Sequence, residues 1–174
     1  MGCCCGCKLC CCAFLVVLTI IAASLGLFGA FFPYPSHASC RVDWVFGTSC
    51  PTVKYKLIEQ MKSWSHDDCS LKQQCSYEYL GEDGNIIRGL HKTPYLKFED
   101  KLNFTLNSID GKCHVTGVSE SGVSFAVIDF GTNYCNLRNL VIGSGLDEND
   151  RFYKENSTNR ICTMYSIAHC NLYT

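Results

Sequence analysis

The sequence predicts an α+β fold, in which an antiparallel meander sheet of about five strands is packed by one N-terminal helix and stapled by disulfides, behind an N-terminal transmembrane helix. Three observations predict this class. Residues 9–32 carry no charged side chain. Of the chain's 15 cysteines, eight are spread over residues 40–170. Between these cysteines, apolar residues recur first at helical spacing and then in alternation.

The uncharged run, residues 9–32, has the length of a membrane span. A helix of 24 residues reaches about 36 Å, enough to cross a hydrocarbon core of about 30 Å. Pro33 and Pro35 follow and end the helix. The run is longer than the apolar region of a signal peptide, so we expect an uncleaved signal anchor. A signal peptide that is cleaved after Ala38 is the alternative, because small residues, Ser36 and Ala38, occupy the third and the first position before that cleavage site.

Features beyond this run give its orientation. Asn103 and Asn156 begin glycosylation sequons, and spaced cysteines suit an oxidising compartment. Both place residues 40–174 outside the cell or in the secretory lumen. The expected organisation is a type II single-pass protein of the plasma membrane or a secretory-pathway membrane, with a cytosolic Cys-rich tail (1–8), an anchor (9–32) and an extracellular or lumenal disulfide-rich domain (40–174).

Cysteines also crowd the N-terminus, next to the expected anchor. Palmitoylation at such positions inserts an acyl chain directly into the adjacent leaflet. The lipidation candidates are Cys3, Cys4, Cys5, Cys7, Cys10, Cys11 and Cys12. Unmodified thiols and a metal–thiolate cluster are the alternatives.

Small residues recur every four positions within the anchor, at Ala22, Gly26 and Ala30. Such a face lets two helices approach closely. These small residues predict a homodimer. The other expected partners are the membrane and an extracellular protein or matrix partner of unknown identity.

The domain begins with an expected helix after Ser49 or Cys50, because Pro51 suits a first helical turn. Its apolar stripe would pack on the sheet and consists of Val53, Leu57, Met61 and Trp64. The strands of the meander are expected over residues 75–80, 85–90, 101–107, 113–118 and 123–130, with a tight turn at Asp110–Gly111. The last of these is apolar on both faces and is expected to be central and buried.

The remainder is expected to hold a second short helix that begins at residues 131–133 and ends near Gly143, capped by Thr132 or Asn133. Residues 147–160 are expected to form an exposed loop, and residues 161–165 a final short strand.

Eight cysteines of the domain are disulfide candidates: Cys40, Cys50, Cys69, Cys75, Cys113, Cys135, Cys162 and Cys170. They allow about 105 pairings, among which sequence does not choose. We favour the short-range pairs Cys69–Cys75 and Cys162–Cys170. An even number leaves no obligatory free thiol, which argues against a cysteine nucleophile.

The net charge and the sequence motifs limit the classes of function that the chain can have. Lys and Arg number 15 against 16 acidic residues, so the chain lacks the basic excess of a nucleic-acid binder. No catalytic motif, metal-ligand spacing or cofactor motif is found, and the acidic run 147–150 lacks the glycine and distal glutamate of a calcium loop. Four polar residues around the second helix start are interpreted as ligand-facing: Thr132, Asn133, Asn136 and Asn139. Helix capping is the alternative explanation for them.

Several segments together resemble a family of small cysteine-rich animal proteins without known function. The resemblance rests on residues 93–95 and 98–100, on the motif Asp129-Phe-Gly-Thr-Asn-Tyr-Cys-Asn-Leu137 and the residues before it, and on residues 143–146, 162–166 and Cys170. It covers most of residues 40–174. It implies a secreted or membrane-attached protein and no activity.

The leading hypothesis is therefore a non-enzymatic type II membrane protein whose glycosylated, disulfide-bonded ectodomain is a binding or structural module. A cleaved and secreted extracellular-matrix or ligand-binding protein is the alternative. An extracellular hydrolase is the third hypothesis.

Overall fold

The computed structural model describes residues 4–31, 37–66, 74–94, 96–123 and 126–170, and within the first range it describes side chains for residues 11–27. The chain divides into two compact units, residues 1–34 and residues 35–174. Each unit is described by itself.

The first unit contains helix α1 (Cys4–Phe31), which is 28 residues long. All side chains described in it are exposed. They include Ala22 and Gly26 of the expected small-residue face, whereas the side chain of Ala30 lies outside the described set. In the described part of the chain, no helix has both the length and the apolarity that a membrane span requires.

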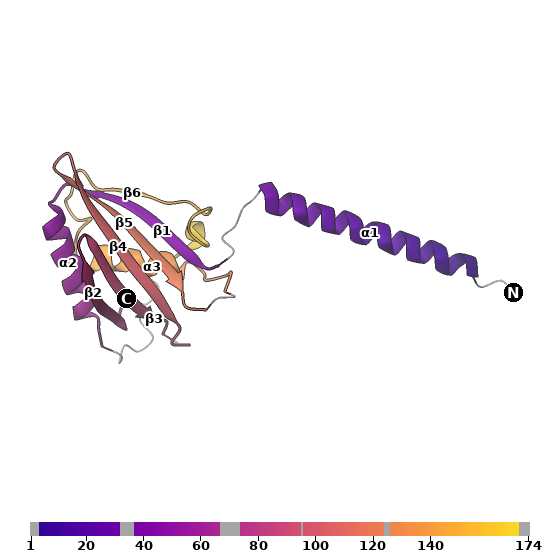
Figure 1. Ribbon diagram of the computed structural model, residues 1–174, viewed down its shortest axis with the longest axis horizontal. Coiled ribbons are helices and arrows are strands. Elements are labelled where there is room, and N and C mark those ends of the chain that lie inside the picture. Colours follow the sequence, from indigo (N-terminus) through magenta and orange to yellow (C-terminus); the bar gives the residue numbers. More distant parts are fainter. Residues whose placement is uncertain (1–3, 32–36, 67–73, 95, 124–125, 171–174) are drawn as a thin grey trace. The chain divides into compact units, whose positions relative to one another are not determined.

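The second unit is a two-layer α+β domain in which helices α2 (Cys50–Ser63) and α3 (Thr132–Gly143) pack on one face of a six-stranded antiparallel sheet (Figure 1). The strands are β1 (Ser39–Phe46), β2 (Tyr77–Asp83), β3 (Ile86–Lys92), β4 (Glu99–Ile109), β5 (Lys112–Ser121) and β6 (Lys154–Asn156). Their order across the sheet is β2-β3-β4-β5-β1-β6. The predicted α+β, disulfide-stapled class is confirmed.

Strands β2 to β5 form the predicted meander. Each pairs antiparallel with the next along the chain. The turn between β4 and β5 is at Asp110 and Gly111, as predicted, and both residues have positive φ, of 51° and 73°. Two residues of this backbone conformation match the twist of a hairpin, and glycine adopts it without a steric penalty.

Strand β1 is absent from the predicted set, although it lies between β5 and β6. Its side chains alternate, with Val42, Trp44 and Phe46 buried between less buried neighbours. Val42 lies opposite Gly117 of β5. A Cβ atom at Gly117 would lie 2.6 Å from the Trp44 ring, so the glycine makes room for the indole.

Helix α2 confirms the predicted stripe. Val53, Leu57 and Met61 are buried against the sheet and Trp64, just past the last turn, is half-buried. Ser49 precedes the helix and Pro51 lies in its first turn. Pro51 has no N–H to leave unpaired there, which suits that position.

Helix α3 begins and ends where predicted, but its cap differs. Gly131 occupies the N-cap with a left-handed φ of 79° and offers no side chain. The Asp129 carboxylate instead accepts the backbone N–H groups of Gly131 and Asn133, each at 3.1 Å. The prediction that Thr132 or Asn133 caps the helix is therefore wrong, because the capping group is supplied one turn earlier in the chain.

The predicted central strand over residues 123–130 is wrong. No described residue of this segment is in a strand, and Val127, Ile128 and Phe130 are exposed. Strand β5 already has β4 on one side and β1 on the other, so no ladder position is open beside it. Phe130 and Gly131 take positive φ and turn the chain into α3. Apolar composition alone does not bury a segment.

The C-terminal predictions also need correction. Residues 161–165 make an isolated bridge between Cys162 and Cys40, followed by the short 3₁₀ helix η1 (Tyr165–Ile167), rather than a strand. Conversely, β6 lies within the expected loop 147–160. Both Cys162 and strand β6 pair with the backbone of β1, which is distant from them in the sequence.

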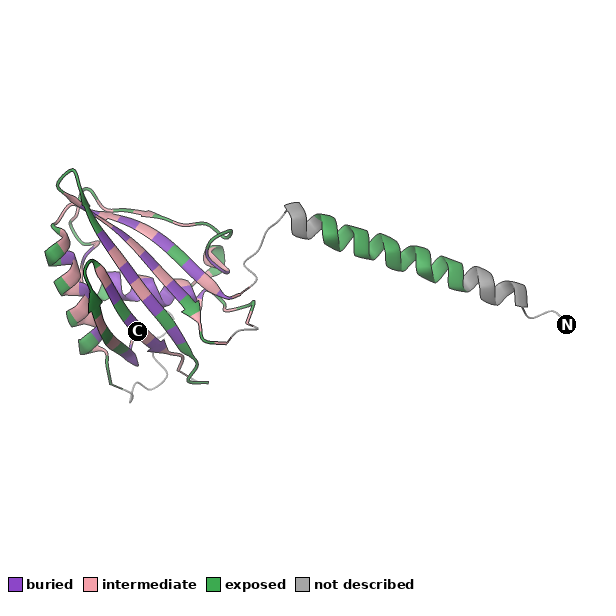
Figure 2. Ribbon diagram, viewed as in Figure 1, coloured by how far each residue is buried: buried purple, intermediate pink, exposed green. Residues whose placement is uncertain are grey.

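The core lies between the sheet and the two helices, and buried residues alternate along the central strands (Figure 2). Trp44, Phe46, Phe104 and Leu57 are among its largest fully buried side chains. One face of each central strand therefore packs on helices, and the other faces outward.

Candidate functional site

Two clusters of polar side chains lie where α3 meets the sheet. The Glu155 cluster consists of Trp44, Tyr134, Arg138, Asp147, Tyr153 and Glu155. The Asp100 cluster consists of Tyr77, His91, Asp100, Ser119, Asn133, Asn136 and Asn139.

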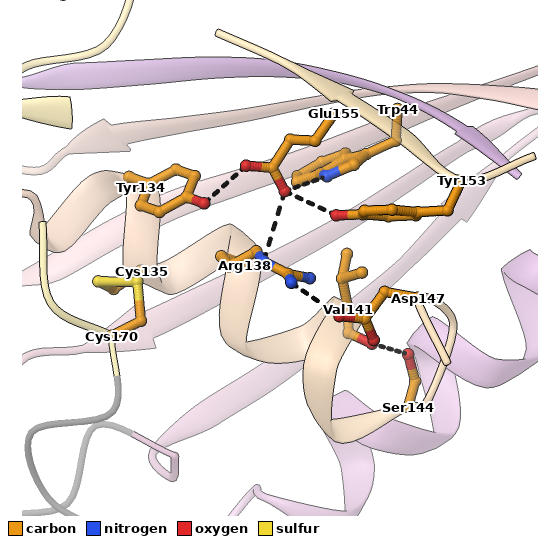
Figure 3. A network of polar contacts seen from close by, with 10 residues as sticks. All are labelled: Trp44, Tyr134, Cys135, Arg138, Val141, Ser144, Asp147, Tyr153, Glu155 and Cys170. Carbon is orange, nitrogen blue, oxygen red and sulfur yellow. Dashed lines mark hydrogen bonds and ion pairs between the residues drawn. A yellow bond between two sulfur atoms is a disulfide. The ribbon is translucent and has the colours of Figure 1, made fainter. Parts of the chain in front are cut away.

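Glu155 of β6 is the hub of the first cluster (Figure 3). The hydroxyl of Tyr134 donates to Oε1 at 2.6 Å. The indole Nε1 of Trp44 and the hydroxyl of Tyr153 donate to Oε2 at 2.8 and 2.7 Å. The Nε of Arg138 lies 3.4 Å from the same oxygen. One carboxylate thereby joins β1, β6 and α3.

Arg138 extends this cluster to the loop after α3. Its Nη2 donates to Asp147 Oδ2 at 2.7 Å, and both side chains are more than four-fifths buried. Burial opposes the charged form of Arg138, but the contact with Asp147 and the nearby Glu155 outweigh it and raise the pKa of Arg138. The guanidinium is therefore held between two carboxylates.

The tyrosines of this cluster act as donors. Burial, followed by the hydrogen bond to Glu155 and its negative charge, raises the pKa of Tyr134 and of Tyr153 above the usual range. Both hydroxyls stay protonated at neutral pH and donate to a fixed negative charge. This arrangement suits the attachment of the edge strand β6 to the helix, because every donor contributes a charge-assisted bond.

The Asp100 cluster is more deeply buried. Asn136 Nδ2 donates to Asp100 Oδ2 at 2.8 Å and to Ser119 Oγ at 3.3 Å. Ser119 Oγ in turn donates to Asn133 Oδ1 at 2.7 Å. The Nδ2 of Asn133 donates to Asp129 at 2.8 Å, which connects the cluster to the helix cap.

Tyr77 and His91 extend the Asp100 cluster across the sheet. The Tyr77 hydroxyl donates to the backbone oxygen of Asn136 at 3.0 Å, and its ring packs on His91 with centroids 4.4 Å apart. His91 lies opposite Tyr77 on one side and Asp100 on the other. Burial raises the pKa of Tyr77 above its usual range, so its hydroxyl also remains a donor.

Asp100 carries the carboxyl group of this cluster. Burial raises its pKa from 3.8 to about 6, and the hydrogen bond from Asn136 opposes this shift. The group is chemically able to hold or release a proton. However, Asp100 is 2% exposed and Ser119 is 0% exposed, so a substrate cannot reach either without a rearrangement.

Of the four residues interpreted as ligand-facing, three are buried and one is half-buried. Asn133, Asn136 and Asn139 are buried on the sheet-facing side of α3, and Thr132 is half-buried. Asn133 and Asn136 bond within the Asp100 cluster. The side-chain amide of Asn139 lies near the Tyr77 hydroxyl without hydrogen-bonding geometry, and neither its nitrogen nor its oxygen has a hydrogen-bond partner among the described residues.

Three disulfides have both cysteines among the described residues: Cys40–Cys162, Cys50–Cys113 and Cys135–Cys170. The favoured Cys162–Cys170 pair is therefore wrong. Cys162 lies beside β1 and Cys170 beside α3, so spatial proximity and not sequence separation decided the pairing. Cys75 is also in a disulfide, and Cys69 of the favoured Cys69–Cys75 pair lies outside the described residues.

The N-terminal lipidation candidates are described only in part. Cys11 and Cys12 are exposed free thiols. Cys4, Cys5, Cys7 and Cys10 are in α1 without described side chains, and Cys3 lies outside the described residues.

The two sequon asparagines lie on the outward face of the sheet. Asn103 of β4 alternates with the buried Leu102 and Phe104. Asn156 of β6 is exposed and lies opposite Asp43, whose neighbours in β1 point inward. A glycan at either position would extend away from α2 and α3.

The hollows on the surface of the domain include two that are lined by described residues. The smaller, of about 340 Å³, is lined by Lys62, Ser65, Ser76, Tyr77, Glu78, Tyr79 and Lys92. The larger, of about 500 Å³, is lined by Gly47, Thr48, Thr52, Lys56, Gly145, Leu146, Glu148, Asn149, Asp150, Arg151 and Phe152. Neither is lined by Asp100 or Glu155. No three metal-ligating side chains converge among the residues described.

The sequence patterns did not predict Asp100, His91, Glu155 or Arg138 as members of a site. For two of them a signal exists. His91 continues the inward positions of β3 after Ile87 and Gly89, and Asp100 precedes the inward residues Leu102 and Phe104 of β4. A polar residue at an inward position of an alternating strand indicates a buried polar contact.

The fold and its cysteines define the class of this protein as a disulfide-stapled α+β domain, preceded in the chain by helix α1. No protein-family model matches the chain, and no curated protein or solved structure shows significant similarity to it.

Proposed function

We propose that residues 39–170 form a non-enzymatic binding or structural domain, located outside the cell or in the secretory lumen and carried by a type II membrane anchor. The observation that carries this proposal is the set of three disulfides. Such bonds persist in oxidising compartments and are rare in the cytosol.

The positions of the disulfides support a structural role in that setting. Cys50–Cys113 joins the start of α2 to the start of β5, across 63 residues. Cys40–Cys162 and Cys135–Cys170 attach the C-terminal segment to β1 and to α3, across 122 and 35 residues. Closing loops of these lengths contributes roughly 4–5 kcal/mol each in the chain-entropy estimate. A reducing compartment would remove this contribution.

The two polar clusters support a non-enzymatic domain. The carboxylate of Glu155 is already coordinated by neutral donors and Arg138. Asp100 and Ser119 are buried and bond to asparagines of α3. Both clusters hold elements together, which fits a rigid module that presents its surface to a partner.

The anchor part of the proposal is supported by the sequence of residues 9–32 and by the continuous helix α1. This run includes positions at both ends whose side chains are outside the described set. Cleavage after Ala38, which would give a secreted matrix or ligand-binding protein, is the second candidate. An extracellular hydrolase is the third.

The test is the mass and topology of the mature protein expressed in animal cells. Intact mass distinguishes the anchored chain from a chain starting at Ser39. Endoglycosidase treatment of Asn103→Gln and Asn156→Gln variants reports lumenal exposure, because each variant should lose one glycan step. A reduced, unglycosylated chain in the cytosol would overturn the proposal.

Acylation of the N-terminal cysteines is a further part of this proposal. A palmitate analogue should label the chain in a hydroxylamine-sensitive manner, and replacing all seven clustered cysteines by serine should abolish the label. The matched control leaves these cysteines in place and replaces Cys135 and Cys170. Equal labelling of both variants would contradict acylation at the N-terminus.

A further inference from the structure

One end of the folded domain carries a concentration of exposed apolar side chains from two loops. Leu96 and Phe98, between β3 and β4, are 69% and 41% exposed. Val127, Ile128 and Phe130, between β5 and α3, are 45%, 60% and 75% exposed. These five residues are called the apolar end.

The sheet register brings the two loops to the same end of the domain. Asp100, near the start of β4, lies opposite Ser121, at the end of β5. The backbone of Gly122 lies directly on that of Glu99, since a Cβ atom on Gly122 would collide with the Glu99 carbonyl oxygen. The apolar residues that precede β4 and follow β5 therefore share one side of the domain (Figure 1).

The chain also enters the domain at this end. Ser39, the first residue of β1, lies opposite Glu120 near the end of β5. The backbone N–H of Ala38 donates to the oxygen of Ala126 at 2.7 Å, and its oxygen accepts from Ser121 N at 3.0 Å. The start of the domain is thus hydrogen-bonded to the loop that carries Val127, Ile128 and Phe130.

Chain length limits how far this end can be from the uncharged run. Phe32 ends that run and Ala38 lies six residues later. Six extended residues span at most about 20 Å. If residues 9–32 are in a bilayer, the apolar end is tethered close to its surface.

We infer that the apolar end contacts the lipid bilayer that holds the N-terminal segment, with Ile128 and Phe130 entering the interfacial region. This inference rests on the proposed membrane anchor. Aromatic and branched aliphatic side chains on a tethered surface suit that region. The opposite end of the sheet has polar turns at Asp83–Asn85 and Asp110–Gly111.

Charge plays little part in this contact. The exposed charged residues beside Leu96 and Phe98 are Lys97 and Glu99, which have opposite signs. Insertion of apolar side chains, rather than attraction to anionic lipid, would therefore hold the surface. Vesicles of phosphatidylcholine alone are the appropriate probe.

The test uses the full chain reconstituted in phosphatidylcholine vesicles with or without bromine on the acyl chains, which quenches tryptophan on contact. Phe130→Trp places a reporter in the apolar end. Tyr55→Trp is the matched control, because Tyr55 is exposed on α2 and its neighbour Lys54 bonds to Gly84 at the opposite end. The native Trp44 and Trp64 are common to both variants.

We expect brominated lipid to lower the emission of the Phe130→Trp variant by about one third, since one of its three tryptophans contacts lipid, and to leave the Tyr55→Trp variant unchanged. Equal emission changes in the two variants overturn the inference. A blue shift without quenching also overturns it, because a protein and not lipid then covers this end. Ile128→Trp is the second reporter if circular dichroism shows that Phe130→Trp does not fold.

Alkaline carbonate extraction of the same vesicles separates the two proposals. A chain that stays with the vesicles but shows no quenching retains its anchor and contradicts only the lipid contact. A chain released by carbonate contradicts the anchor, and the lipid contact is then refuted with it.

Discussion

Replacing Asp100 by asparagine should change how the stability of the domain depends on pH. Burial raises the pKa of Asp100 from 3.8 to about 6; hydrogen bonds from Asn136, Ser121 and Gly122 oppose the shift, and the charge of Asp129 adds to it. The folded domain therefore binds this proton more tightly than the unfolded chain. The stabilising contribution of the protonated group is complete below pH 3.8 and is lost as the pH rises to about 6.

The size of the effect follows from the two pKa values. A difference of about two units corresponds to about 3 kcal/mol in the free energy of unfolding. Asparagine keeps an oxygen that accepts from Asn136 Nδ2 but does not ionise. The stability of Asp100→Asn relative to the wild type should therefore rise by about 3 kcal/mol between acidic and neutral pH, whatever the variant's stability at any one pH.

Urea unfolding from pH 3 to pH 7, under oxidising conditions, measures this difference. Asp110→Asn is the matched control, since Asp110 is exposed in the turn between β4 and β5 and asparagine tolerates its positive φ. If the stability difference between Asp100→Asn and the wild type is constant over this range, the account of the buried carboxyl is refuted.

Three further substitutions test the packing. Glu155→Gln should lower the free energy of unfolding in urea by about 2–3 kcal/mol, because hydrogen bonds to a neutral amide replace charge-assisted hydrogen bonds. An unchanged urea midpoint would contradict the role of Glu155 in joining β1, β6 and α3. Gly117→Ala should cost about 1–3 kcal/mol through overpacking against Trp44, read as a lower thermal midpoint; a stabilised variant would refute the close approach. Replacing both Cys40 and Cys162 by alanine should cost up to about 5 kcal/mol, and peptide mapping of the wild-type protein that finds Cys162 joined to a cysteine other than Cys40 would contradict the pairing.

Local patterns predicted the elements whose stability is local. The spacing of Val53, Leu57 and Met61 identified α2, and Asp110–Gly111 identified a hairpin, because both signals depend on residues close in sequence. Strand β1 shows the same kind of signal, since its buried residues alternate from Cys40 to Phe46. It was nevertheless missing from the predicted sheet, whose last place was assigned to residues 123–130.

There is a physical reason why β1, and not the segment 123–130, pairs with β5. A strand needs a partner with free backbone groups, and the neighbour of β5 could be either the segment that follows it or one that precedes it by many residues. The alternating β1 offers one apolar face to the helices and one polar face to solvent. Residues 126–130 have apolar side chains at alternating and adjacent positions, and Asp129 among them caps α3. This segment lies at the surface, and β1 occupies the ladder position beside β5.

The sequence by itself determined the α+β class, the meander of β2 to β5, helix α2 and the use of cysteines in disulfides, because periodicity and turn chemistry act over a few residues. Only the tertiary structure decided which cysteines pair, that Asp100 and Glu155 become hubs of polar clusters beneath α3, and that an apolar loop is exposed beside Ala38. Each of these depends on contacts between residues far apart in the chain, which the sheet register creates and local patterns do not encode.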